Sequence, residues 1–237
     1  MSRSKNTDKV CVLILLLTLV LTTVFMKSAS IGVVAAESDA AADEKGGFSE
    51  RDYIDTWSEK DAVRISLDDL KGFTGNGAYE YEGDLYLVDK GTYVLSGHLK
   101  DQQIIVKAKG AKLQIVLNGV ELEEDDQAAL VVEKADKVFL TLAENTENSI
   151  SAGTIEDADG VPDAAIYSKS DLSINGKGSL KITTEAGHGI KSKDDLVITN
   201  GKITVDAGGN GIVGKDSVRI ADGEITITTS VDAVNMN

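Results

Sequence analysis

The sequence is poor in residues that cross-link chains, ligate metals or catalyse reactions: it has one cysteine, two histidines and one proline among 237 residues. A single cysteine, Cys11, cannot close a disulfide within the chain, so a continuous apolar core must stabilise the fold. His98 and His188 show no metal-ligand spacing, and no glycine-rich phosphate loop precedes a helix. Nucleophilic catalysis of the serine or cysteine type therefore has no support in the sequence.

Basic side chains are also few, with 24 lysines and arginines against 39 aspartates and glutamates and a net charge of −15. Residues 1–36 carry four of the basic residues and one acidic residue, so the rest of the chain has a net charge of −18. This acidity argues against nucleic acid and anionic membrane as partners. Two explanations stay open: solubility outside the cell, and binding of divalent cations, because Ca²⁺ takes carboxylate and carbonyl oxygens.

What the sequence does contain is a repeat of about 22 residues in its last third. The apolar anchors Ile166, Ile190, Ile212 and Val234 lie 24, 22 and 22 residues apart. Two further sets recur with the same spacing, namely Leu172, Leu196 and Val218, and the pairs Leu180/Ile182, Ile203/Val205 and Ile225/Ile227. A fixed period of this kind is the signature of a protein built from stacked repeats.

Each repeat is predicted to consist of short strands. Apolar residues alternate in 196–198 and 203–205, and β-branched residues are frequent. The intervening turn, Asn200-Gly201, would by itself fit a meander of hairpins. The constant spacing of like residues instead favours stacking of one repeat on the next. The sequence therefore predicts an all-β fold, a right-handed single-stranded parallel β-helix, a solenoid with coils ~4.8 Å apart.

The chain is predicted to have four parts. Residues 1–36, with a basic start, an apolar run and small residues after it, are typical of a signal peptide, and retention as an N-terminal anchor is the alternative. Residues 37–62 are predicted as an acidic linker, 63–84 as an N-terminal cap, and 85–237 as the parallel β-helix, C-terminally incomplete. The polar stretch 143–162 is predicted as an inserted surface loop. We expect a secreted monomer, extracellular or at the cell surface.

Equivalent positions of stacked repeats are expected to form columns on the surface. One column holds His188, Asn210 and Asp232; a second holds Asp194 and Asp216, with Asp195 beside it; a third holds Lys169, Lys193 and Lys215. Stacked carboxylates repel one another unless a cation lies between them. The acidic positions are therefore either Ca²⁺ ligands or part of a solvated face that the lysines neutralise.

Resemblance to a known family rests on four segments: ADKVFLTLAENTEN, AAIYSKSDLSINGKGSLKI, HGIKSKDDLVITNGKITV and NGIVGKDSVRIADGEITI. Together they resemble the family of secreted bacterial carbohydrate-binding β-helix proteins, over about Gly91 to Asn237. The resemblance implies a fold related in shape to pectate lyases that binds cellulose or acidic pectin-like sugars, with Ca²⁺ on the coil surface. The family usually carries Asp before its Gly-Ile step, where this chain has His188 and Asn210 and keeps only Asp232.

These observations predict a non-catalytic protein that binds cell-wall polysaccharide on one face, with acidic sugars bridged to the acidic chain by Ca²⁺. The candidate sugar contacts are His188, Asn210, Asp232, Lys191 and Arg219. The candidate Ca²⁺ ligands are Asp194, Asp195, Asp216, Asp232 and Asn210. Aromatic platforms for neutral sugars are scarce in the repeats, where only Tyr167 remains, and Tyr86 and Tyr93 are assigned to the core.

Two alternatives stay open. A Ca²⁺-dependent polysaccharide lyase of the pectate-lyase type would need a base beside a uronate, for which Arg219, Lys191 and Lys215 are candidates. A structural or adhesion protein of the cell surface would use the repeats as a spacer and would retain no polysaccharide.

Overall fold

The computed structural model describes residues 47–155, 160–229 and 231–236, all within one compact unit. The predicted signal peptide or anchor lies outside the described residues. The predicted all-β content is confirmed, since the described helices are two 3-10 turns, η1 (Glu50–Tyr53) and η2 (Leu67–Asp69). None of the helices in the described ranges is long and apolar enough to cross a membrane.

The strands assemble into two sheets, and the first contains eleven parallel strands. Three of its strands pair in the order β1 (Val63–Ser66), β5 (Gly91–Lys100) and β7 (Lys112–Glu124), and two rows of strands, here called arms, continue from β7. One arm consists of β9 (Lys137–Leu142), β12 (Asp171–Gly176), β15 (Asp195–Ile198) and β18 (Ser217–Ile220). The other arm consists of β10 (Glu147–Thr154), β13 (Ser179–Ala186), β16 (Lys202–Ala207) and β19 (Glu224–Thr229). The 13-residue strand β7 pairs with both arms.

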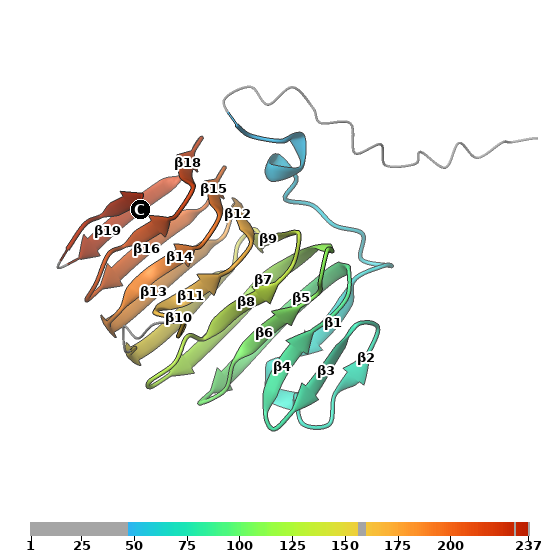
Figure 1. Ribbon diagram of the computed structural model, residues 1–237. Coiled ribbons are helices and arrows are strands. Elements are labelled where there is room, and N and C mark those ends of the chain that lie inside the picture. The colour runs from blue at the N-terminus through green and yellow to red at the C-terminus, as the bar shows by residue number, and fades with distance from the viewer. Residues whose placement is uncertain (1–46, 156–159, 230, 237) are drawn as a thin grey trace, which may run out of the picture. The chain divides into compact units, whose positions relative to one another are not determined.

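The second sheet contains nine strands. In spatial order they are β2 (Thr74–Gly75), β3 (Ala78–Tyr81), β4 (Asp84–Leu87), β6 (Ile104–Lys107), β8 (Leu130–Lys134), β11 (Ala164–Ser168), β14 (His188–Ser192), β17 (Ile212–Gly214) and β20 (Val234–Met236). The range 63–84, predicted as a cap, thus holds β1, η2, β2 and β3 and reaches the start of β4. Equivalent strands of successive repeats lie side by side (Figure 1).

The 22-residue period sets the register between strands, as the spacing predicts. Ile166 pairs with Ile190, Ile190 with Ile212, and Ile212 with Val234. The first three of these side chains are fully buried and belong to one continuous apolar core. Burying an isoleucine contributes about 1.5–3 kcal/mol, so the repeats of Ile166, Ile190 and Ile212 each add a stabilising layer to the same core, whereas Val234 is 44% exposed.

The prediction of a single-stranded parallel β-helix is wrong. The strands form two sheets rather than one uniform solenoid, and the second sheet is mixed, because β2, β3 and β4 pair antiparallel before parallel pairing begins at β4 and β6. Long β7 also joins two rows of strands into one sheet. A period in sequence specifies which residues stack, but it does not specify how rows of strands merge into sheets.

The prediction of a surface loop over 143–162 is also wrong in part, because β10 occupies Glu147–Thr154 and pairs with β7 and β13. Its inward residues Asn148, Ile150 and Ala152 are buried. The Asn148 carboxamide accepts the backbone N–H groups of Gly119 and Val120 at 3.0 Å each. Because Asn148 is polar but faces inward, the apolar alternation that indicates a strand is interrupted in the sequence of β10.

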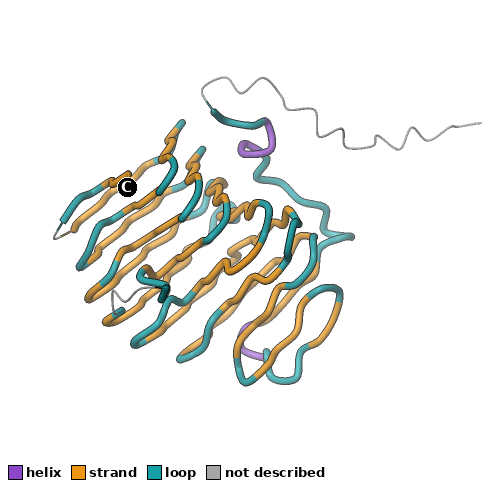
Figure 2. Tube along the Cα trace, in the orientation of Figure 1, coloured by secondary structure: helices purple, strands orange, loops and turns teal. Residues whose placement is uncertain are grey.

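The N-terminal segment, defined here as residues 47–62, lies against the first arm of the larger sheet (Figure 1). The Asn175 carboxamide donates to the carbonyls of Asp52 and Ile54 at 3.0 and 3.1 Å. The Thr199 hydroxyl donates to the Asp52 carbonyl at 2.6 Å. The strands and the turns that connect them in successive repeats are distinguished in Figure 2. Part of the range predicted as a linker is therefore hydrogen-bonded to the repeats.

Candidate functional site

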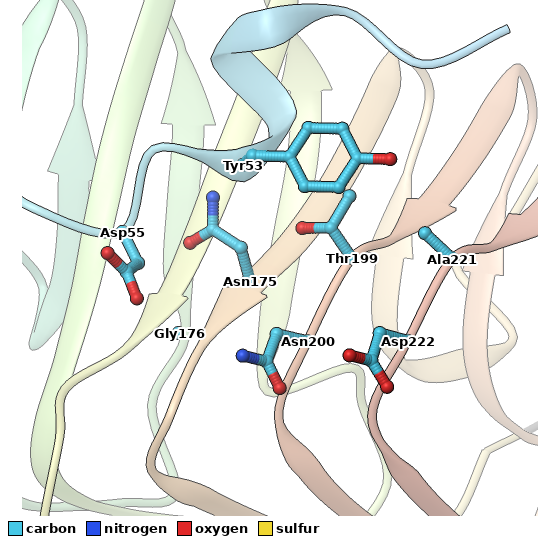
Figure 3. Close-up of a pocket in the computed structure, with 8 residues that line it drawn as sticks. All are labelled: Tyr53, Asp55, Asn175, Gly176, Thr199, Asn200, Ala221 and Asp222. Carbon is cyan, nitrogen blue, oxygen red and sulfur yellow. The ribbon is translucent and has the colours of Figure 1, made fainter. Parts of the chain in front are cut away.

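A cleft of about 370 Å³ lies between the N-terminal segment and three places in successive repeats: the end of β12 and the turns that follow β15 and β18. Figure 3 shows its lining residues, which are Tyr53, Asp55, Asn175, Gly176, Thr199, Asn200, Ala221 and Asp222. Six of them come from three successive repeats and two come from the N-terminal segment. The repeats thus supply a row of like positions, and the segment supplies the opposite wall.

The floor of the cleft is formed by polar turn residues in equivalent positions. The Asn200 side-chain oxygen accepts the N–H of Gly201, and one Asp222 oxygen accepts the N–H of Gly223, each at 2.8 Å. Each side chain is thereby fixed by its own turn. The Asn200 amide nitrogen and the second Asp222 oxygen remain for a ligand, and the two side chains lie next to each other in Figure 3.

Tyr53 of the N-terminal segment forms the aromatic wall of the cleft, and Trp57 of the same segment lies in a neighbouring hollow. Tyr53 is 53% exposed, and its ring lies beside Thr199 in Figure 3. Trp57 lines an adjoining hollow of about 290 Å³, which shares Asp55 with the cleft. The indole N–H of Trp57 donates to Glu59 at 2.9 Å, which orients the ring. Aromatic rings beside polar groups suit a ligand that has both apolar and hydroxylated faces.

A buried ion pair holds the aromatic wall in place. Lys137 on β9 lies 2.8 Å from the Asp52 carboxylate, and the exposures of these side chains are 14% and 1%. The hydroxyl and backbone N–H of Ser49 both donate to Asp52 at 2.8 Å. Burial raises the pKa of Asp52, but the hydrogen bonds from Lys137 and Ser49 prevail and hold it below its ordinary value.

The predicted sugar column is brought together by the structure, but its polar atoms link one turn to the next. The His188 Nδ1 atom accepts the Asn210 backbone N–H at 2.9 Å, and the Asn210 side-chain oxygen accepts the Asp232 backbone N–H at 3.0 Å. One Asp232 oxygen accepts the Asn235 side-chain amide at 3.0 Å. These contacts give the column a structural role within the stack.

Lys191, another predicted sugar contact, forms a close, partly buried ion pair with Asp163. The same carboxylate lies 3.6 Å from Nε2 of His188. Sequence analysis missed Asp163 because it precedes β11 in an irregular turn, one position before the alignment of the repeats begins.

Among the predicted Ca²⁺ ligands, Asp195 is bound by protein groups. One Asp195 oxygen accepts the Ser217 hydroxyl at 2.6 Å, and the other accepts the Arg219 guanidinium at 3.0 Å. Arg219 also donates to the Gly47 carbonyl at 2.8 Å, so it bridges the N-terminal segment and β15. Within the described ranges, no three or more histidine, cysteine or acidic side chains are arranged to hold a metal ion. A protein cation thus neutralises Asp195.

Asp194 and Asp216 do lie together, as the repeat predicts. Burial, the charge of Asp216 and a hydrogen bond with it raise the pKa of Asp194. Burial and the charge of Asp194 raise the pKa of the neighbouring Asp171. This pair of stacked carboxylates favours a shared proton or a bound cation over two free charges.

A second aromatic surface lies on β3 and β4. Tyr79 and Tyr86 stack with ring centroids 5.1 Å apart, and Tyr81 meets Tyr86 edge-on at 6.4 Å. The Lys107 ammonium lies 5.1 Å from the Tyr86 ring. Tyr86 therefore does not have the predicted core position, whereas Tyr93 is fully buried as predicted.

Comparison with known proteins decides the family. A family model described as "Carbohydrate-binding domain-containing protein" matches residues 81–237, well over half of the chain. The chain belongs to this family. The predicted carbohydrate-binding membership is thus confirmed, and the matched residues include the cleft-lining end of β12 and the turns after β15 and β18.

Two relatives are informative. A carbohydrate-binding domain-containing protein of Acetivibrio thermocellus is 32% identical over 152 residues, which are 62% of this chain and 51% of the relative. The chain spans about half the length of that curated relative. A solved structure, that of the polysaccharide lyase-like protein from C. thermocellum as a gadolinium derivative, is 30% identical and covers 73% of each chain, with a TM-score of 0.65.

Proposed function

We propose that the chain is an extracellular, non-catalytic protein that binds cell-wall polysaccharide in the cleft between the N-terminal segment and the repeat turns. The observation that carries this proposal is that the Tyr53 ring and the polar side chains of Asn200 and Asp222 line the same cleft. The apolar face of a sugar ring would pack on the aromatic wall, while its hydroxyls would bond the side chains of the floor. Membership of a carbohydrate-binding family supports this assignment.

The charge of the cleft bears on which sugars enter it. Asp55 and Asp222 are both acidic and both line the cleft. A neutral chain can contact them directly as a hydrogen-bond donor. A uronate chain brings further carboxylates and requires a cation between sugar and protein, for which Ca²⁺ is suited by its preference for oxygen ligands. Calcium dependence is thus proposed for acidic polysaccharide only.

Tyr53→Ala is expected to weaken retention on polysaccharide about tenfold, the equivalent of about 1.4 kcal/mol, because it removes the aromatic wall. The measurement is affinity electrophoresis in gels that contain pectin or a soluble cellulose derivative, with Ca²⁺ and with EDTA. Tyr81→Ala is the matched control, since Tyr81 is exposed to a similar extent, 57%, on the distant β3. EDTA should release the protein from pectin and leave its retention on the neutral polymer unchanged.

The control also tests the alternative surface. If Tyr81→Ala lowers retention and Tyr53→Ala does not, the tyrosines on β3 and β4 are the site and the cleft is not. If neither variant nor wild type is retained on any polymer, the spacer function is correct and polysaccharide binding is rejected.

The position of Arg219, one of the three candidate bases, does not support a lyase function. Arg219 donates hydrogen bonds to Asp195 and to the Gly47 carbonyl, and these contacts hold its guanidinium away from the role of a base. We propose that this residue anchors the N-terminal segment. Ultraviolet absorbance of unsaturated products should not rise when the protein is incubated with polygalacturonate and Ca²⁺. A rise that Arg219→Lys abolishes would overturn the non-catalytic assignment.

A further inference from the structure

Five asparagines in the chain are followed directly by glycine, namely Asn76, Asn118, Asn175, Asn200 and Asn210. In such a pair the backbone nitrogen of the glycine can attack the side-chain carbonyl carbon of the asparagine, because glycine has no side chain to obstruct the approach. The attack requires the two reacting atoms to be held close together. The structure therefore decides which of these pairs reacts in the folded protein.

The pair Asn200 and Gly201 has the geometry for this attack. The Gly201 N–H donates to the Asn200 side-chain oxygen at 2.8 Å, and the carbonyl carbon is bonded to that oxygen at about 1.2 Å. Asn200 is half-buried and lies on the floor of the cleft, where solvent reaches it (Figure 3). Within the described residues no hydrogen bond holds its amide nitrogen. The glycine nitrogen thus lies beside its target, and the leaving group is unrestrained.

Three other pairs lack this arrangement in the described structure. The Gly119 N–H donates instead to the Asn148 carboxamide at 3.0 Å, and the Gly211 N–H donates to the Asp232 carbonyl at 2.9 Å. At Asn76 the φ of +42° lies in the left-handed region, in which the next backbone nitrogen is turned away from the side chain. None of these glycine nitrogens therefore faces the carbonyl of its own asparagine.

Asn175 provides a comparison in the same local sequence, because Asn-Gly-Lys occurs both at 175–177 and at 200–202. The Asn175 side chain is 1% exposed, and its amide nitrogen donates to two carbonyls of the N-terminal segment at 3.0 and 3.1 Å. Its oxygen accepts the Thr141 hydroxyl at 2.7 Å. These hydrogen bonds prevent the side chain from turning toward the Gly176 nitrogen. One sequence is therefore held rigidly in one repeat and is free to react in the next.

We propose that Asn200 is a site of spontaneous deamidation in the folded protein, with water as the co-reactant. The Gly201 nitrogen loses its proton to solvent and forms a bond to the Asn200 side-chain carbonyl carbon. The side-chain nitrogen takes up a proton and leaves as ammonia, so a succinimide ring closes. Water then opens the ring at one carbonyl to give aspartate, or at the other to give isoaspartate.

The product alters the chemistry of the cleft floor. A carboxamide donates two N–H groups, whereas a carboxylate only accepts hydrogen bonds. Asp55 and Asp222 already line the cleft, so the reaction adds a third carboxylate. Gly223 makes the same 2.8 Å contact with Asp222, but a carboxylate has no ammonia to release, so any reaction there leaves the charge unchanged. Weaker retention on polysaccharide after deamidation rests on the proposed function, whereas the reaction itself does not.

Peptide mapping by mass spectrometry, on the full chain kept folded at mildly alkaline pH, tests the proposal. Cleavage after lysine gives the peptides 170–177 and 194–202, which contain the two Asn-Gly-Lys motifs. We expect deamidated 194–202 to accumulate about tenfold faster than deamidated 170–177, or faster still. In urea the two motifs should react at similar rates, because the contacts that distinguish them are lost. A sample digested before incubation corrects for reaction during the digest.

Asn200→Gln is the matched variant, because the longer side chain closes a ring far more slowly, and its peptide 194–202 should keep its mass. Equal rates of the two motifs in the folded protein would overturn the proposal. So would an Asn200 that reacts in urea but not in the folded chain, since the turn would then protect the residue.

Asn200→Asp separates the reaction from its consequence. This variant carries the new carboxylate from the start, and its retention on pectin in EDTA should be several-fold weaker than that of fresh wild type. Deamidation of 194–202 together with unchanged retention of Asn200→Asp would confirm the modification site and contradict only the placement of polysaccharide in the cleft.

Discussion

Asp52→Ala is expected to release the N-terminal segment from the repeats and to abolish polysaccharide retention. The substitution removes the partner of Lys137 and both hydrogen bonds that the Asp52 carboxylate accepts from Ser49. Breaking a buried ion pair by deleting one member costs about 3–5 kcal/mol, because the remaining charge stays buried without compensation. The hydrogen bonds that remain, from Asn175, Thr199 and Arg219 to carbonyls of the segment, are expected to be too few to hold it, since each contributes about 1 kcal/mol.

Limited proteolysis and the fluorescence of Trp57, the only tryptophan in the chain, measure the release. We expect cleavage within residues 47–62 and a red-shifted emission in Asp52→Ala. The control is Asp61→Ala, which removes the same charge from the same segment at an exposed position. A segment that stays protected in Asp52→Ala would show that the backbone hydrogen bonds suffice and that the ion pair is dispensable.

The same ion pair predicts a response to acid. The folded-state pKa of Asp52 is lowered, with hydrogen bonds from Lys137 and Ser49 outweighing the opposite effect of burial. The stabilisation is therefore present above the ordinary pKa of 3.8 and is lost as the pH falls through the lower folded-state value. Trp57 emission in wild type should change only below about pH 4, and Asp52→Ala should already have the altered emission at neutral pH.

The register of this fold was predictable from sequence, and its sheet architecture was not. Leu172, Leu196 and Val218 share a spacing and a context, and they stack as that spacing predicts. The merging of two rows of strands depends on β7, where Asn118 and Gly119 resemble a turn but the chain continues as strand. An Asn-Gly pair predicts a turn only where no neighbouring strand pairs with it. Here β5 pairs along both halves of β7, while β9 pairs with the first half and β10 with the second.

For the candidate site, too, the sequence predicts which side chains lie together but not what they bind. The columns of His188, Asn210 and Asp232 and of Asp194 and Asp216 follow directly from the period. Their roles depend on hydrogen bonds across the stack, which no spacing specifies. Tyr53 lies more than 120 residues from the Asn175 carboxamide that binds its segment, and only the tertiary structure brings them together. The available signal was a tyrosine and a tryptophan in a mostly polar stretch.

Gly176→Ala is expected to destabilise the fold by about 3–5 kcal/mol and to deform the cleft that this residue lines. Gly176 has φ +100°, a conformation that side chains disfavour, and an added Cβ would lie 2.2 Å from the Leu142 carbonyl oxygen of the preceding repeat. That carbonyl already accepts the N–H groups of Lys177 and Gly178 at 3.1 and 3.2 Å. The methyl group must therefore displace backbone rather than a flexible side chain.

Gly119→Ala separates the two causes, because Gly119 also has a positive φ, +78°, but an added Cβ there meets nothing within 4 Å. It should cost only about 1 kcal/mol, the strain of the backbone alone. Urea unfolding of the two variants gives both values, and retention on polysaccharide should fall for Gly176→Ala only. Equal costs would mean that the repeats slide apart to admit a methyl group. Moving one repeat away from the next, below the cleft, would then cost less free energy than the close approach of Gly176 to the Leu142 carbonyl indicates.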